Sequence, residues 1–530
     1  MAGGTNGSDR YQTRAGFFDE VFATPGQPRD HAMPLAAALD SLGPEALAAA
    51  GRSRDSIFMS QGITFDAAGP EHDGPVRDRP FPLDLVPRII PAAEWRTIKR
   101  GLAQRIRALN AFVDDVYHAR EIVHEGIVPW QLIVSRSAFA RAAHDIRPPG
   151  GVYCHVSGCD LVRDADGSWK VLEDNVRTPS GISYVLENRV AMTRLLPGLF
   201  GSYRVRPVDH YPALLRQALT EVAPTSVEEE ATVVVWTPGP FNSAYFEHAF
   251  LARQMGVELV EASDLVVRDG VCSIRTTNGL QRVHAIYRRI DDAFMDPLEF
   301  RPDSLLGVPG LMRAYRAGTV AIVNAVGTGV ADDKAVYHHV PDMIRFYLRE
   351  EPILANVPTY LMADPDQRRA ALARLDELVV KPVDESGGKG VFIGPGAGDE
   401  AIARQADEIR RRPERWIAQE LVRLSTCPSA APDGTLVARH VDLRPFAVFG
   451  EDIHIVPGGL TRVALREGSM IVNSSQGGGS KDTWVLEEDP GDTMEFPVAS
   501  SWAPPELPGL RQHGGWSSQQ QQQQQQRGRG

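Results

Sequence analysis

Three residues with hard oxygen donors lie close together in residues 158–181, whose sequence is GCDLVRDADGSWKVLEDNVRTPSG. Short strands are predicted on both sides of the Asp-Ala-Asp-Gly turn at residues 164–167. The resulting hairpin would place Asp160 at the opening of one strand and Glu173 and Asn175 at the end of the other. Mg²⁺ usually takes one or two carboxylates together with phosphate oxygens and water. The segment therefore predicts a magnesium site, and its alternative interpretation is a solvated acidic turn.

A lysine and a glycine-rich turn form a second group, in residues 379–394, VVKPVDESGGKGVFIG. Lys381 ends an apolar strand, and Gly387, Gly388 and Gly390 follow it. Glycine lets backbone N–H groups approach a phosphate closely, and the lysine adds a point charge. The spacing GxxxxGK[ST] of a P-loop is absent. Taken alone, the segment also fits an ordinary hairpin turn.

Two arginines and an asparagine occur in three later segments, DLRPFAVFG, GGLTRVA and VNSSQGGGSKD. These segments are predicted to be successive strands, and they carry Arg444, Arg462 and Asn473. A guanidinium group is planar and binds two oxygens at once. The two arginines therefore suit phosphate or acyl-phosphate oxygens, whereas in a surface ion pair they would matter little.

The first segment closely resembles the metal motif of ATP-grasp ligases, such as the ribosomal-protein glutamate ligases and D-alanyl-alanine ligase. The shared pattern is Gly-x-Asp, a hairpin turn and Leu-Glu-x-Asn, followed here by Pro179-x-Gly181. In that family the Asp, Glu and Asn coordinate two magnesium ions that bridge the ATP phosphates. The resemblance thus implies metal-ligand roles for Asp160, Glu173 and Asn175.

The resemblance extends to the nucleotide, because Asp333-Lys334 precedes the glycine turn and Trp416-Ile-Ala-Gln-Glu420 follows it, as in the ATP-grasp lobe. It implies that ATP is held by two lysines, a closing glycine loop and an adenine pocket: Lys334 and Lys381; Gly387, Gly388 and Gly390; Gln419, Glu420 and Val422. The third group resembles a run of Asp-x-Arg, Arg and Asn in the glutamate ligases. That run implies that Arg444, Arg462 and Asn473 face the charge that develops in phosphoryl transfer. Taken singly, Lys334 and Glu420 also fit ordinary surface charges.

The order of the motifs is rotated. In an ordinary ATP-grasp ligase the metal motif follows the glycine-rich Asn segment, whereas here it comes first. The chain is thereby identified as resembling the circularly permuted ATP-grasp family (type 2), whose relatives include glutathionylspermidine synthetases. One departure is Gly158, which stands where some of these ligases have an arginine. The substrate-side arginine is then left open among Arg177, Arg288 and Arg289.

The expected fold is multi-lobed, of the α+β / α/β class, with a circularly permuted ATP-grasp core and a pre-ATP-grasp-like α/β domain. Apolar periodicity predicts a helix over 92–118 and a small Ala-rich helix near 35–50. A strand from Thr232, a helix to Met255 and a stop at Gly256 predict a β-α-β unit. The expected division is an N-terminal arm at 1–75, the metal-binding part of the core at 76–200, a substrate domain at 201–325, an ATP-binding lobe at 326–430, the remaining core strands at 431–485 and a disordered Pro/Gln-rich tail at 486–530.

Composition argues against several classes of protein. The formal net charge is −12 and no basic stripe stands out, which disfavours a nucleic-acid partner. No segment approaches the ~18 apolar residues that cross a bilayer, and the first residues resemble no export signal. A cytoplasmic location is therefore expected. The four cysteines show no paired CxxC spacing, which predicts neither disulfides nor a zinc site.

The function implied by the resemblance is a Mg-ATP-dependent ligase of a carboxylate with an amine. Such enzymes transfer the γ-phosphoryl group to the carboxylate, and the amine then displaces phosphate from the acyl phosphate. The implied cofactors are ATP and two Mg²⁺ ions, and the implied partners are small-molecule or peptide carboxylate and amine substrates. A helix N-terminus near Asn242 and Ser243 is a candidate site for an anionic substrate group, or else a plain packing layer. A catalytically silent ATP-binding scaffold and an ATP-dependent phosphotransferase remain alternatives, and the sequence leaves the substrates and the oligomeric state open.

Overall fold

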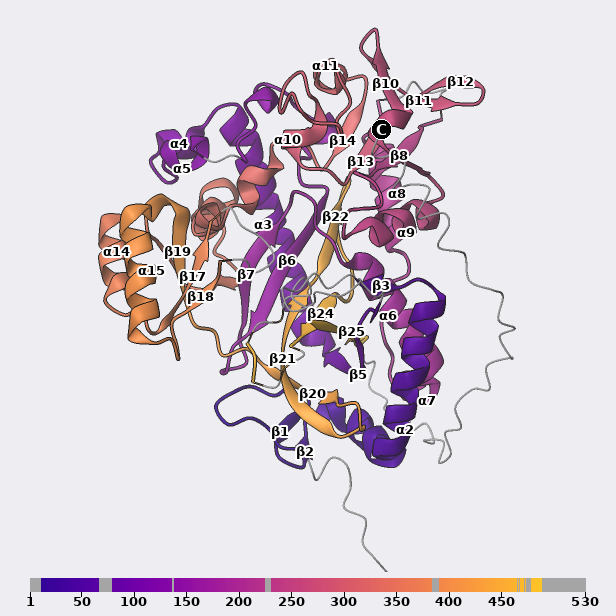
Figure 1. Ribbon diagram of the computed structural model, residues 1–530, viewed down its shortest axis with the longest axis vertical. Helices are drawn as coiled ribbons and strands as arrows, with labels where there is room; N and C mark the ends of the chain where they lie inside the picture. Colours follow the sequence, from indigo (N-terminus) through magenta and orange to yellow (C-terminus); the bar gives the residue numbers. More distant parts are fainter. Residues whose placement is uncertain are drawn as a thin grey trace, which may run out of the picture.

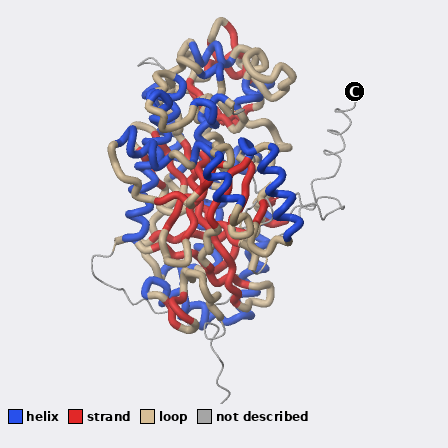
Figure 2. The backbone as a smooth tube through the Cα atoms, turned by 90° about the vertical axis from the view of Figure 1, so that its left-hand side faces the viewer, coloured by secondary structure: helices blue, strands red, loops and turns tan. Residues whose placement is uncertain are grey.

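The structure is a computed structural model, and it describes residues 11–65, 79–135, 138–224, 230–383, 390–464, 466, 468–470, 472 and 478–488. Helices and strands alternate along most of this length, as the expected mixed α/β class requires. Figure 1 shows a broad central sheet with one smaller lobe beside it and a second α/β unit above it. Figure 2, turned by 90°, shows the strands of the central sheet enclosed by helices.

The central sheet draws its strands from both ends of the chain. Across the described residues it has ten strands, and its main path is β15-β7-β6-β21-β24-β25-β5, with β20 on β21 and β22 between β6 and β23. Their bounds are β5 (Leu83–Ile90), β6 (Val156–Arg163), β7 (Trp169–Asn175), β15 (Ala355–Asn356), β20 (Thr426–Ala430), β21 (Leu436–Arg444), β22 (Phe446–Phe449), β23 (Ile453–Ile455), β24 (Leu460–Val463) and β25 (Gly479–Val485). β5 runs parallel to β25, with Leu83 opposite Ser480. An early strand and a late strand therefore share one edge of the sheet.

The two faces of this sheet differ because successive side chains of a strand point to opposite sides. Cys159 and Leu161 of β6 pack with Trp95 and Ile98 of helix α3 (Ala92–Tyr117) in one buried cluster. Helix α3 confirms the helix predicted over 92–118. The intervening Asp160 points to the other face of the sheet, where it meets Arg444 and Arg462.

A four-stranded parallel sheet forms the second unit, in the order β14-β13-β8-β9. Its parts are α8 (Tyr211–Glu221), β8 (Val233–Trp236), α9 (Tyr245–Met255), β9 (Glu258–Val260), β13 (Ala285–Arg288) and β14 (Ala321–Val323), with the small sheet β10 (Leu265–Arg268), β11 (Val271–Thr276) and β12 (Gly279–Arg282) attached. Helix α9 stops at Gly256, which has a left-handed φ of 66°. The β-α-β prediction is confirmed. The strand order reverses between β8 and β13, and such a switch point is where open α/β sheets bind ligands.

The small lobe at the left of Figure 1 is an antiparallel sheet covered by two helices. Its elements are β16 (Thr359–Leu361), α14 (Pro365–Leu372), β17 (Leu378–Pro382), β18 (Phe392–Ile393), α15 (Asp399–Arg411) and β19 (Trp416–Glu420), in the sheet order β16-β19-β17-β18. Leu378, Val380 and Ala418 pack with Ile409 on the helix side. The alternate residues of these strands face away from the two helices.

The N-terminal segment is packed into the molecule. Helix α2 (Met33–Ser60) is longer than predicted, and it is interrupted at Gly43 because that glycine has φ 69° and ψ 168°. Asp19 and Glu20 are almost completely buried. Glu20 pairs with Arg88 of β5 at 2.5 Å and with Arg163 of β6 at 2.9 Å. The predicted arm is thus tied to the central sheet by buried charges.

The remaining elements are short, apart from α6: β1 (Phe22–Thr24), β2 (Gln27–Pro28), β3 (Thr64–Phe65), β4 (Arg79–Pro80), α4 (Glu121–His124), α5 (Trp130–Val134), α6 (Ile182–Leu195), α7 (Pro197–Gly201), α10 (Asp292–Met295), α11 (Leu311–Arg316), α12 (Lys334–Tyr337) and α13 (Val340–Met343). In the described ranges, no helix combines the length and the apolar character that a membrane span needs. All four cysteines are buried and free. Residues 489–530, which hold nearly all of the predicted disordered tail, lie outside the described residues.

Candidate active site

The predicted metal hairpin is formed by β6 and β7. Asp160 lies opposite Glu173, and Gly158 lies opposite Asn175. Opposite residues of an antiparallel pair share a face, so the three predicted metal ligands lie on one side of the hairpin. Asp160 sits in the middle of β6, whereas the sequence had placed it at the opening of a strand; the strand already begins at Val156 because apolar and small residues precede it.

Both predicted arginines reach Asp160. Arg444 donates from Nε to Oδ1 at 2.5 Å and from Nη2 to Oδ2 at 2.8 Å. Arg462 donates from Nη2 to Oδ2 of the same carboxylate at 2.6 Å. Arg462 also pairs with Asp442, its opposite residue on β21. The late strands β21 and β24 therefore place two guanidinium groups against a carboxylate of the early hairpin.

The two carboxylates of the hairpin differ in their electrostatics. Burial opposes the ionisation of Asp160, but the charges of Arg444 and Arg462 outweigh it and hold the pKa of this carboxyl below its ordinary value. The nearest approach of Glu173 to Arg444 is 3.7 Å, which is longer than the contacts of Asp160 with this arginine. Burial and the neighbouring charge of Asp160 raise the pKa of Glu173. A cation bound beside the hairpin would therefore stabilise the ionised form of Glu173 more than that of Asp160.

Two predicted lysines come from the small lobe and its connection. Lys381 lies on β17, and Lys334 begins α12, which is capped by the side chain of Asp333. The charges of both lysines act on Glu173 and favour its ionised form. Burial, with Lys334 adding to it, lowers the pKa of Lys381 to about 8. The structure thus brings Lys334 and Lys381 to the hairpin that carries Asp160 and Glu173.

The other predicted nucleotide residues fall into separate places. Gly390 has a left-handed φ of 68° and lies against Pro382, while Gly387, Gly388 and Asn473 lie outside the described residues. Gln419 is buried on the face of β19 that the helices leave uncovered. Val422 is buried with Val162 and Val357 between the small lobe and the central sheet.

Glu420 points to the opposite, helix-covered face. Its carboxylate accepts hydrogen bonds from Tyr360 at 2.7 Å and from Arg374 at 2.9 Å. This follows from strand alternation, because Glu420 is one residue beyond Gln419. The nucleotide contact predicted for Glu420 would fall to its main chain, and it stays a prediction.

Three further groups that support the hairpin were not singled out from the sequence. Asp442 on β21 accepts a hydrogen bond from Arg462. Arg105 of α3 donates two hydrogen bonds of 2.6 Å to Asp174, on the back of the hairpin. Asp332 accepts from the backbone N–H groups of residues 176 and 177 at 2.5 and 3.1 Å, and burial raises its pKa to about 6. Only Arg105 carries a sequence signal for such a role, because it is a charged residue on the apolar face of the helix predicted over 92–118.

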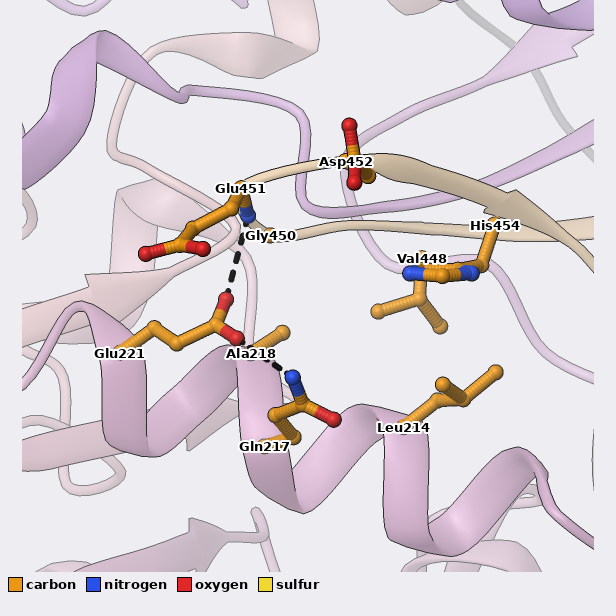
Figure 3. A pocket seen from close by; sticks show the side chains of 9 residues that line it. All are labelled: Leu214, Gln217, Ala218, Glu221, Val448, Gly450, Glu451, Asp452 and His454. Carbon is orange, nitrogen blue, oxygen red and sulfur yellow. Dashed lines mark hydrogen bonds between the residues drawn. The ribbon is translucent and has the colours of Figure 1, made fainter.

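A separate pocket lies between α8 and the β22–β23 turn (Figure 3). There Glu221 accepts hydrogen bonds from Gln217 at 2.8 Å and from the backbone N–H of Glu451 at 3.1 Å. None of the predicted site residues lines this pocket. Within the described part of the chain, no three His, Cys, Asp or Glu side chains form a ready metal cluster. A metal ion at Asp160 and Glu173 would therefore need oxygens from a bound molecule, as Mg²⁺ commonly does with phosphates.

The fold and the site define a class: an antiparallel lobe, with a lysine on the face that its helices leave uncovered, set against a sheet that carries carboxylates and arginines. A family model described as circularly permuted ATP-grasp type 2 matches residues 87–464, and the chain belongs to this family. The expected resemblance and the expected fold class are thereby confirmed.

Relatives of high identity cover most of the chain. It is 53% identical over 472 residues to an uncharacterized protein from Synechocystis, covering 89% of this chain and 97% of the relative. It is 52% identical over 485 residues to an uncharacterized protein from Mycobacterium tuberculosis, covering 91% and 86%. A protein from Frankia alni named as a candidate glutamate–cysteine ligase is 45% identical over 480 residues, which are 90% of this chain and 54% of that protein.

A solved structure shares the fold. A glutathione synthetase-like effector from Globodera pallida aligns with a TM-score of 0.56 and 12% identity, covering 84% of this chain and 98% of the effector. At this identity the likeness concerns the fold alone.

Proposed function

We propose that this protein is a Mg-ATP-dependent carboxylate–amine ligase that works through an acyl phosphate. The observation that carries the proposal is the meeting of Asp160 and Glu173 with Arg444 and Arg462 on one face of the central sheet, with Lys381 supplied by the small lobe. Carboxylates, guanidinium groups and a lysine are the set that phosphoryl transfer requires for charge neutralisation. The family membership and the name of the Frankia relative support the ligase assignment.

The residues fit Mg-ATP chemically. Glu173, whose charge is only partly neutralised, would hold the metal ion with Asp160 and Asn175, and bound Mg²⁺ would neutralise the phosphate oxygens. Lys334 and Lys381 would bind the phosphates, and Arg444 and Arg462 would face the transferred group. A carboxylate oxygen attacks the γ-phosphorus and ADP leaves; an amine then attacks the acyl carbon, phosphate leaves, and the amine loses a proton as the amide forms.

We propose that Arg177 is the arginine that holds the acyl substrate. Arg288 is fully buried and donates to three backbone carbonyls, those of residues 290, 324 and 325. Arg289 is buried and committed to Glu247 and to the carbonyl of Pro179. By contrast, the side chain of Arg177 is 34% exposed, and its two ion pairs, with Asp291 and Asp332, are both as long as 3.4 Å. It follows the metal hairpin directly, and its partner Asp291 lies three residues beyond the carboxyl end of β13, which borders the switch point.

The test is to incubate the protein with Mg-ATP and fractionated carboxylate and amine metabolites, and to follow ADP, phosphate and product masses. A ligase gives ADP, phosphate and a product lighter by one water than the two substrates together. Stimulation no greater than that of the Glu173→Ala variant in every fraction would reject the proposal. Nucleotide binding without turnover would favour the scaffold, and a phosphorylated product without an amide would favour the phosphotransferase. We also propose the six-segment division expected from the sequence, and a cytoplasmic location.

A further inference from the structure

A buried amide, that of Gln419, lies on the face of the small lobe's sheet that α14 and α15 do not cover. In the register of its sheet, Gln419 on β19 lies between Thr359 on β16 and Val379 on β17. Ile393 on β18 continues the row beyond Val379. Residues opposite one another share a face, so this row lies on the same side as Lys381 and away from α14 and α15. Val379 and Ile393 are half-buried apolar side chains, and Gln419 is only 2% exposed.

The hydroxyl of Thr359 fixes which end of the amide is which. Thr359 Oγ1 donates its single proton to the carbonyl of Val357 at 2.8 Å. It must therefore accept from its other neighbour, and Gln419 Nε2 lies 3.0 Å away as the donor. A reversed amide would place two acceptors, Oε1 and Oγ1, against each other, or else cost the bond to Val357.

The other end of the amide is then an acceptor with no partner in the part of the chain that the structure describes. Gln419 Oε1 is buried, and no described residue gives it a hydrogen bond. A buried acceptor left without a donor costs free energy, so native structures usually supply one. The face holds a lysine for phosphates and two apolar side chains that suit the plane of a base. The missing donor is therefore most simply an exocyclic amine of the bound base.

We propose that Thr359, by holding Gln419 as an acceptor, makes this face select purines with a 6-amino group over purines with a 6-oxo group. The inference rests on the proposed function in one respect, namely that a nucleoside triphosphate binds on this face. It adds a positioning residue, Thr359, and a hydrogen-bonding reason for the preference for a 6-amino base, which the adenine pocket implied by the resemblance does not itself supply. A 6-oxo base turns an acceptor toward Oε1, which leaves that atom unpaired. Thr359 is a positioning residue, because it acts through Gln419.

The test measures binding of ATP and ITP to the full chain by isothermal titration calorimetry with Mg²⁺, since the two nucleotides differ at C6 and the adjacent N1. We expect ATP to bind about ten- to a hundredfold more tightly than ITP, the range that one unsatisfied buried group produces. In Thr359→Val the amide is free to turn, so the ratio should fall below about threefold, mainly through tighter binding of ITP. Thr359→Ser keeps the hydroxyl and should keep the ratio.

Thr319→Val is the matched control, because Thr319 also donates to a backbone carbonyl but lies in the parallel-sheet unit. It should leave the ratio unchanged. Gln419→Leu gives an independent check if Thr359→Val does not fold: ATP should weaken to the level of ITP, while ITP changes little. Equal binding of ATP and ITP by the unaltered protein, or an unchanged ratio in Thr359→Val, overturns the inference. Absence of binding by both nucleotides overturns the proposed function as well, so the two failures are distinguishable.

Discussion

Arg444 and Asp160 are 284 residues apart in the sequence, and the two hydrogen bonds between them join the late strand β21 to the early hairpin. Removing the fork of Arg444 would leave the carboxylate of Asp160 to Arg462 alone. The pair therefore allows the contribution of geometry to be separated from that of charge.

Arg444→Lys keeps the positive charge and loses the two-pronged geometry. We expect ADP release to fall on the order of a hundredfold, as when other preorganised donors are removed. Arg374→Lys is the matched control, since Arg374 is a partly exposed arginine of the small lobe that pairs with Glu420, and it should leave turnover within about twofold. Similar rates for Arg444→Lys and the unaltered protein would show that the fork has no catalytic part.

Arg105→Ala should destabilise the fold strongly. Arg105 and Asp174 are both buried, so the substitution leaves an uncompensated carboxylate behind the metal hairpin. The expected loss is about 3–5 kcal/mol in the free energy of unfolding, measured by urea denaturation. Arg96→Ala breaks an exposed pair with Glu488 and should cost less than about 1 kcal/mol. Arg105→Met with Asp174→Leu should recover most of the loss; if it does not, unpaired charge is the wrong cause.

Glu247 and Arg289 hold the segment that follows the metal motif. Glu247 accepts from the N–H groups of Gly181 and Ser183 at 2.7 and 3.1 Å, and Arg289 donates to the carbonyl of Pro179 at 2.8 Å. Glu247→Ala should cost about 3–5 kcal/mol, because Arg289 loses its charged partner and the segment loses its acceptor. Glu247→Gln keeps the acceptor and should cost less. A double-mutant cycle with Arg289→Met should give a coupling of at least about 1 kcal/mol; additive effects would contradict the described link.

His155 should make the fold sensitive to mild acid. Burial lowers the pKa of His155 to about 4. Between pH 6.5 and 4 the unfolded chain binds this proton and the folded protein does not. The free energy of unfolding therefore decreases as the pH falls through that window, by roughly 1.4 kcal/mol per unit for this group. His155→Leu should flatten the pH dependence of urea denaturation there, and an unchanged slope would rule His155 out as its source.

Local patterns in the sequence predict the helices and strands that carry the site better than they predict the long-range contacts between those elements. The hairpin that holds Asp160 and Glu173 follows from β-rich runs and a turn, and its register then brings the two carboxylates together. In contrast, Glu20 pairs with Arg88, which lies more than sixty residues further along the chain. No local pattern encodes such a contact. The family resemblance groups Glu420 with Gln419, and strand alternation turns their side chains to opposite faces of β19. Family resemblance supplied the roles, because charge and spacing alone fit several chemistries.

Because β5 pairs with β25 and β6 pairs with β21, the central sheet can be completed only late in translation. The ribosome makes Asp160 early, but Arg444 and Arg462 emerge only after most of the polypeptide has been made. Until then the hairpin lacks the guanidinium groups that make burial of Asp160 tolerable. Contacts of such large sequence separation also form slowly. The nascent chain therefore carries an incomplete sheet with open edges through most of translation, and a chain truncated before β21 should depend on chaperones to stay in solution.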